Sequence, residues 1–124
     1  MRYAKENLGT MVTFLLPSLK LKERCRGQQT FEDRLHAFLL KKFNGYTASA
    51  ANLFGYWRSH TGRAFYGEHK EYKVSLLDQS RIGLLEAFLA RMGGDMGEKS
   101  VYLAAGDDSW LIYPHPKRRR RVPA

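Results

Sequence analysis

Hydrophobic and polar positions alternate in strand-like and helix-like patterns along residues 11–113. The first pattern is a nearly continuous apolar run over residues 11–16, which is β-branched and aromatic in part. Such a run is typical of a buried central strand, and Pro17 is expected to end it. The next stretch, residues 18–29, is polar and basic and is interpreted as a loop.

A helix is predicted to begin after Thr30 and to end at Asn44 and Gly45. Thr30 can cap the helix, and Asp33 stands where a capping box places an acidic partner. Asn and Gly tolerate the left-handed conformation that commonly ends a helix. The apolar stripe of this helix comprises Phe31, Leu35, Phe38, Leu39 and Phe43.

Residues 46–77 read as two extended segments that form a hairpin. One strand is expected over residues 46–51 and can continue to residue 58, and a turn follows over residues 58–63 with the connection near 60–62. The returning strand shows the period of two that a half-buried strand requires. In it Tyr72, Val74 and Leu76 alternate with Lys73 and Ser75.

A second helix is predicted from Asp78 or Ser80, either of which can cap it, to the glycines at residues 93–94. One face carries Ile82, Leu85, Leu89 and Met92, and Leu84 and Phe88 widen it. Strands are then expected over residues 101–105 and 110–113, joined by a turn over 106–109.

This order of elements predicts an α+β fold. We expect a ferredoxin-like βαββαβ sandwich with an extra C-terminal strand, in which the helices cover one face of an antiparallel sheet. The predicted organisation is an N-terminal arm over residues 1–9, a single ferredoxin-like domain over 10–116 and a flexible basic tail over 117–124.

The 124-residue chain carries a net charge of +9, and five of its cations are consecutive. They are Lys117, Arg118, Arg119, Arg120 and Arg121. Adjacent cations on a flexible arm neutralise phosphates without reading sequence, so this tail is a candidate nucleic-acid-binding segment. No apolar run is long enough to span a bilayer and no signal sequence is recognised, so a cytoplasmic protein is expected.

The cysteine and histidines share no spacing typical of metal ligands. They are Cys25, His36, His60, His69 and His115. No internal disulfide can form from one cysteine, and Cys25 is interpreted as a free thiol in a loop. We expect neither a metal site nor a cofactor.

The central hairpin holds the densest collection of aromatic and charged residues. A ligand-binding cleft is predicted there, and its residues are Tyr56, Trp57, Arg58, Arg63 and Glu68. Aromatic faces interleaved with cations suit base stacking, and the arginines suit a small anionic ligand. Glu68 can also oppose Arg58 or Arg63 across the hairpin as a solvated ion pair.

Exposed aromatic residues on the sheet indicate a surface that another subunit covers. Trp110 and Tyr113 on the last strand add an edge at which a second subunit can pair. A homo-oligomer, either a dimer or a trimer, is therefore predicted.

Several segments resemble the PII-like signalling proteins. They are Met11-Val12-Thr13-Phe14, Phe43-Asn44-Gly45-Tyr46-Thr47, Gly55-Tyr56-Trp57-Arg58 and Glu71-Tyr72-Lys73-Val74-Ser75-Leu76. The resemblance covers about residues 11–102 and implies a ferredoxin-like trimer with ligand sites between subunits. The connection between the second and third strands is too short for the long effector loop of that group, and no nucleotide-binding residue is carried over.

The predicted function is a non-enzymatic, self-associating ligand-binding or regulatory module. One alternative is a nucleic-acid-binding protein that uses the basic tail and the aromatic sheet face. The other is a small dimeric α+β barrel enzyme with His60 or His69 as proton carrier.

Overall fold

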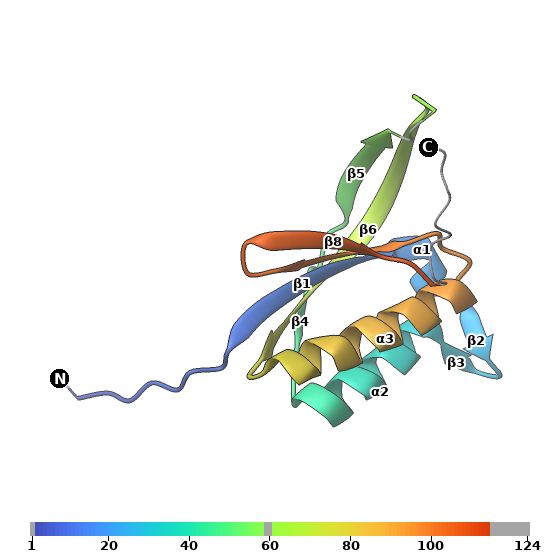
Figure 1. The fold of residues 1–124 in the computed structure, drawn as a ribbon. Coiled ribbons are helices and arrows are strands. Elements are labelled where there is room, and N and C mark those ends of the chain that lie inside the picture. Colours follow the sequence, from blue (N-terminus) through green and yellow to red (C-terminus); the bar gives the residue numbers. More distant parts are fainter. Residues whose placement is uncertain (1, 59–60, 115–124) are drawn as a thin grey trace.

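The computed structural model describes residues 2–58 and 61–114, in which a six-stranded antiparallel sheet carries two long helices on one face (Figure 1). The strands are β1 (Thr10–Pro17), β4 (Thr47–Ala48), β5 (Leu53–Arg58), β6 (Ala64–Leu76), β7 (Val101–Ala105) and β8 (Asp108–Ile112). The long helices are α2 (Phe31–Phe43) and α3 (Gln79–Asp95). The sheet order is β4-β6-β1-β7-β8, with β5 also paired to β6. The predicted α+β class, with helices on one side of an antiparallel sheet, is confirmed.

Strand β1 lies at the centre of the sheet, between β6 and β7. Val12, Phe14 and Leu16 are fully buried under the helices, whereas Met11 is exposed and the residues between them are only partly covered. The expectation that the whole run is buried is therefore corrected. Helices cover only one face of this sheet, so every second residue of β1 points toward the other face.

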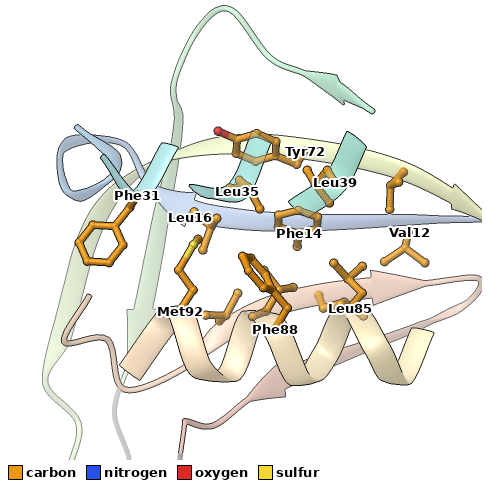
Figure 2. Packing of buried hydrophobic residues seen from close by; sticks show 14 of the residues in the cluster. Val12, Phe14, Leu16, Phe31, Leu35, Leu39, Tyr72, Leu85, Phe88 and Met92 are labelled. Carbon is orange, nitrogen blue, oxygen red and sulfur yellow. The ribbon is translucent and has the colours of Figure 1, made fainter. Parts of the chain in front are cut away.

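The core lies between the sheet and the helices (Figure 2). Phe14 is opposite Tyr72 in the β1–β6 register, and the two rings stack with centroids 5.2 Å apart. The helices supply the other side of the core: α2 contributes Leu35 and Leu39, and α3 contributes Leu85 and Leu89. The predicted alternation of β6 is confirmed, because Tyr72, Val74 and Leu76 face this core.

Helix α2 begins and ends where the sequence predicts. The Thr30 side chain accepts from the Asp33 N–H, and the Asp33 carboxylate accepts from the Thr30 N–H, which completes the capping box. Asn44 follows the helix in the left-handed conformation, with φ of 64°. Both ends of α2 thus rest on local chemistry.

Helix α3 is capped by Asp78 but continues past the glycines expected to end it. Gly93 is buried inside the helix, and a Cβ added there would lie 2.9 Å from Val101 Cγ2. This glycine lets the helix approach β7 closely. The chain turns only at Gly97, where φ is +79°.

The stretch expected to be a loop contains three short elements, α1 (Ser18–Leu21), β2 (Arg24–Arg26) and β3 (Gln29–Thr30). Leu21 is fully buried in the core, which holds α1 against the end of the sheet. Strands β2 and β3 pair around Gly27, whose φ is +55°. A single buried leucine in a polar stretch has no periodicity to reveal it.

The strand expected over residues 46–51 is two strands, β4 and β5, which both pair with β6. Ser49 lies between them and stays attached to β6, because its N–H donates to the Glu71 carbonyl and its hydroxyl accepts from the Glu71 N–H. The last turn comprises Gly106 and Asp107 alone, so β8 starts earlier than expected. No helix among the described residues is long and apolar enough to cross a membrane.

Candidate functional site

The β5–β6 hairpin extends beyond the rest of the sheet (Figure 1). In β6, residues 69–76 pair with β1, whereas residues 64–68 pair with β5 and with no other described strand. The hairpin therefore has a base that is part of the sheet and an outer half that is a two-stranded ribbon. Its connection includes residues 59–60, outside the described ranges.

An open cleft of about 460 Å³ lies at the base of this hairpin. It is lined by Pro17, Leu19, Lys20, Trp57, Tyr66, Gly67, Glu68, His69 and Glu98. These residues come from the end of β1, from α1, from both hairpin strands and from the segment after α3. The volume lies within the range of roughly 300–1,000 Å³ that is common for small-molecule sites.

Glu68 has two neutral hydrogen-bond donors. Asn52 Nδ2 donates to Oε1 at 3.2 Å, and the Tyr66 hydroxyl donates to Oε2 at 3.3 Å. Desolvation and then the neighbouring Glu68 carboxylate raise the pKa of the Tyr66 phenol above its ordinary value. These contacts orient the Glu68 carboxylate, and because both donors are neutral they do not neutralise its charge.

The register does not place Glu68 opposite Arg58, as the expected ion pair requires. Glu68 is opposite Phe54, and Arg58 is opposite Ala64 at the far end of the hairpin. The Arg58 guanidinium instead donates to the Gly62 carbonyl at 3.1 Å.

His69 lies half-buried at the inner end of the cleft, opposite Pro17 in the β1–β6 register. Burial lowers the pKa of its imidazole below the ordinary value, and the Glu98 carboxylate and the Gly67 backbone oppose this shift. Burial without a paired charge favours the neutral ring. His69 is therefore available at neutral pH as a hydrogen-bonding group without charge.

Lys20 and Glu98 close the side of the cleft away from the hairpin. Lys20 Nζ lies 2.8 Å from Glu98 Oε2 and also donates to the Met96 carbonyl at 2.9 Å. These contacts join α1 to the segment after α3, although 78 residues separate Lys20 from Glu98 in the chain.

The cleft contains some of the predicted ligand-binding residues and leaves out others. Trp57 and Glu68 line it, whereas Tyr56, Arg58 and Arg63 are not among its lining residues. The sequence interpretation missed Lys20 and Glu98. It also did not place His69 in the same cleft as Glu68. Adjacent strand residues point to opposite faces, but residues of both faces line this cleft, since a two-stranded ribbon twists strongly.

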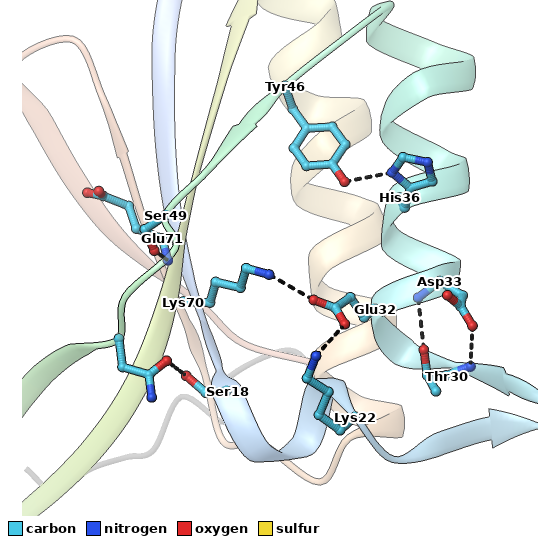
Figure 3. Close-up of polar contacts among 11 residues, drawn as sticks. Ser18, Lys22, Thr30, Glu32, Asp33, His36, Tyr46, Ser49, Lys70 and Glu71 are labelled. Carbon is cyan, nitrogen blue, oxygen red and sulfur yellow. Dashed lines mark hydrogen bonds and ion pairs between the residues drawn. The ribbon is translucent and has the colours of Figure 1, made fainter.

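A second polar cluster joins α2 to the sheet on its helix side (Figure 3). Glu32 accepts from Lys70 at 2.8 Å and from Lys22 at 3.0 Å, and the Lys70 hydrogen bond is the largest cause of the lowered pKa of Glu32. The Tyr46 hydroxyl lies 2.7 Å from His36 Nδ1. These contacts are positioned to hold β4 and β6 against α2.

The remaining candidates from the sequence contribute no site within the described residues. Cys25 is a partly buried free thiol, and no group of three or more potential metal ligands occurs in residues 2–58 and 61–114. His60, His115 and the basic residues 117–121 lie outside those ranges, so nucleic-acid binding by the tail stays a prediction.

Comparison with known proteins finds related structures but no related sequences. No family model matches the chain, and no curated protein matches it. Two solved structures share its fold, both of a phage SAM lyase. The complex with S-methyl-5'-thioadenosine has a TM-score of 0.55 at 13% identity, covering 91% of this chain and 95% of that chain. The apo structure has a TM-score of 0.59 at 13% identity, covering 91% and 96%.

These neighbours correct the predicted function. The sequence led to a non-enzymatic module, whereas the two structures that share the fold are of an enzyme. Of the three interpretations, the alternative of a small enzyme is the closest to this finding. Neither structure is of a PII-like protein, so that resemblance stays a prediction.

Proposed function

We propose that this chain is an enzyme that binds S-adenosylmethionine in the cleft at the base of the hairpin and cleaves a carbon–sulfur bond. The observation that carries the proposal is the composition of the cleft, which is lined by Trp57, Tyr66 and Glu68 and in which the Tyr66 hydroxyl donates to the Glu68 carboxylate. The fold shared with a phage SAM lyase, seen in complex with S-methyl-5'-thioadenosine, supports this ligand class.

The substrate class fits the aromatic part of the cleft. A sulfonium carries a fixed positive charge, which aromatic faces attract. When the bond between sulfur and the amino-acid chain breaks, its electron pair stays on sulfur and the charge disappears. The carbon fragment balances by losing a proton from the neighbouring carbon or by closing onto its own carboxylate, so no water is consumed. Contact of the sulfonium with aromatic rings, which removes part of its hydration, favours such a loss of charge.

Glu68 is assigned to binding rather than to the sulfur itself. A carboxylate in contact with the sulfonium would stabilise the charged substrate more than the transition state, and would slow the reaction. Its oxygens retain lone pairs beyond the Asn52 and Tyr66 hydrogen bonds. We therefore assign Glu68 to the ribose hydroxyls or to the ammonium group of the substrate.

The test is to incubate the purified protein with S-adenosylmethionine and to measure the formation of S-methyl-5'-thioadenosine by mass spectrometry. We expect time-dependent formation of the thioether, and a loss of roughly tenfold or more in kcat/KM for Glu68→Gln. Glu6→Gln, an exposed carboxylate that precedes β1 at the end of that strand opposite to Pro17 and the cleft, is the matched control and should keep full activity. Absence of both turnover and calorimetric binding of either adenosyl compound would refute the proposal.

We also infer that the sheet is a ferredoxin-like variant. The order β4-β6-β1-β7, with α2 and α3 on one face, supports a βαββαβ core to which β8 adds the extra C-terminal strand. In this interpretation α1 and the β2–β3 pair are an insertion between the first strand and the first helix of the core.

Self-association is proposed as well. Aromatic side chains are exposed on both faces of the outer hairpin, and Trp110 and Leu111 are exposed on the edge strand β8. Apolar surfaces of this kind are commonly covered by another subunit. Light scattering after size exclusion should give the mass of a dimer or trimer, and a monomer at micromolar concentration would contradict it.

A further inference from the structure

Trp57 occupies space that is available only because two strand residues lack side chains. A Cβ added at Gly55, two residues earlier on β5, would lie 2.2 Å from Trp57 Cη2. Gly67 is the cross-strand partner of Gly55, and a Cβ there would lie 3.5 Å from Trp57 Cζ3. The indole therefore leans along the hairpin toward the sheet, over a floor made of backbone.

His69 forms the second wall beside this indole. Its ring meets that of Trp57 edge-on, with centroids 5.1 Å apart and planes at 66°. A Cβ at Gly67 would also lie 2.7 Å from His69 Cε1, so the imidazole rests on the same backbone floor. The two rings form a corner, and Trp57, Gly67 and His69 all line the cleft.

The other aromatic residues of the hairpin are engaged differently. Tyr66 lies between Phe54 and Tyr56, with centroids at 5.9 Å and 5.3 Å, and its hydroxyl is committed to Glu68. Trp57 combines a position fixed by the two glycines and His69 with a ring that is still 38% exposed. A large aromatic side chain held still and left partly open is suited to stacking against a flat ligand.

We propose that Trp57 is the stacking platform for the purine base of the ligand, held in place by the Gly55–Gly67 pair and the edge of His69. This inference rests on the proposed function, since it assumes an adenosyl ligand in the cleft. It adds that the base lies on the indole, so that the ribose and the amino-acid end of the substrate face the polar residues Lys20, Glu68 and Glu98.

The experiment uses Trp57 as its own reporter. The chain has two tryptophans, so Trp110→Phe leaves Trp57 as the single one. Titration of this variant with S-methyl-5'-thioadenosine should give saturable quenching of its fluorescence, because the adenine stacks on the indole. Methylthioribose, which lacks the base, should cause no such quenching.

Affinity measurements supply the second arm. Trp57→Leu should weaken calorimetric binding of S-methyl-5'-thioadenosine by about tenfold to a hundredfold, the usual effect of losing one stacked base. Gly55→Ala should weaken it too by displacing the indole, whereas Gly45→Ala should not, because a Cβ there meets nothing within 4 Å.

The outcomes separate the inference from the proposed function. If the ligand binds without quenching Trp57, and Trp57→Leu keeps its affinity, the platform is refuted while adenosyl binding stands. If the unaltered protein neither turns over S-adenosylmethionine nor binds either adenosyl compound by calorimetry, both are refuted. If Gly55→Ala does not fold, the Trp57→Leu affinity and the quenching still decide.

Discussion

The two halves of strand β6 both carry aromatic residues but have very different surroundings. Residues 69–76 pair with β1, and the helices cover their inner face, so that Tyr72, Val74 and Leu76 are buried. Residues 64–68 pair with β5 alone among the described strands, and Phe65 and Tyr66 are about half exposed. Aromatic residues thus serve as core in one half and as surface in the other.

The comparison shows that the covering layer, rather than the strand, makes a core position. Tyr72 illustrates the strength of the cover, because burial raises the pKa of its phenol and its hydroxyl has no hydrogen-bond partner among the described residues. Five residues earlier, Gly67 and its neighbours lie open to the cleft. The boundary between the two halves is where the candidate site lies.

The largest expected effect comes from deleting one ring on the strand that pairs with each half. Phe14→Ala removes a fully buried ring stacked on Tyr72, and should reduce the free energy of unfolding by about 3–5 kcal/mol. Phe54→Ala removes a ring that is 57% exposed and should cost less than about 1 kcal/mol. Urea denaturation of both variants measures the difference. Equal losses would mean that the outer hairpin is packed in solution.

Hydrogen exchange compares the two halves without any substitution. Amides in residues 70–76 should exchange at least about a hundredfold more slowly than those in 64–68, because opening the core requires sub-global unfolding. Mass spectrometry of peptides from the two segments measures this, and the inner segment is the internal reference. Equal protection would contradict an uncovered outer half.

Two glycines of α3 test how closely the covered half is packed. Gly93→Ala places a Cβ 2.9 Å from Val101 Cγ2 and should destabilise by about 1–3 kcal/mol. Gly83→Ala, where a Cβ meets nothing within 4 Å, should stabilise by about 0.5–1 kcal/mol through helix propensity. Thermal denaturation checks both, and a neutral Gly93→Ala would show that α3 can move away from β7.

The smallest effect concerns the ion pairs that hold β6 to α2. The pKa of Glu32 is lowered from 4.5, first by the Lys70 hydrogen bond, so its stabilisation is present above pH 4.5 and is lost as pH falls through the folded-state pKa. Glu32→Gln should cost no more than about 1 kcal/mol at pH 7, and the difference should vanish at low pH. Unfolding measured from pH 7 to pH 3 gives the profile. A difference that persists at pH 3 would assign the effect to packing.

Local chemistry accounts for the parts of the fold that the sequence predicted well. The cap at Thr30, the left-handed Asn44 and the alternation up to Leu76 each depend on residues within a few positions of one another. The end of α3 was predicted wrongly, because Gly93 serves contact with Val101 on another element rather than helix termination.

The candidate site was predictable only in part for the same reason. Trp57 and Glu68 were identified from the aromatic and charged composition of the hairpin. Lys20 and Glu98 carry no local signal, since their roles depend on the ends of α1 and α3 meeting beside the hairpin. The prediction of function was wrong because it rested on the composition of the hairpin, which does not specify the geometry of a site.

By itself, the sequence determined the α+β class, the two capped helices and the face that β6 turns to the core, because periodicity and capping act over a few residues. Only the tertiary structure decided that the hairpin extends beyond the helices that cover the sheet, and that Trp57 lies over Gly55 and Gly67 in contact with His69. Such contacts arise from register and twist between distant segments, which no local pattern of residues encodes.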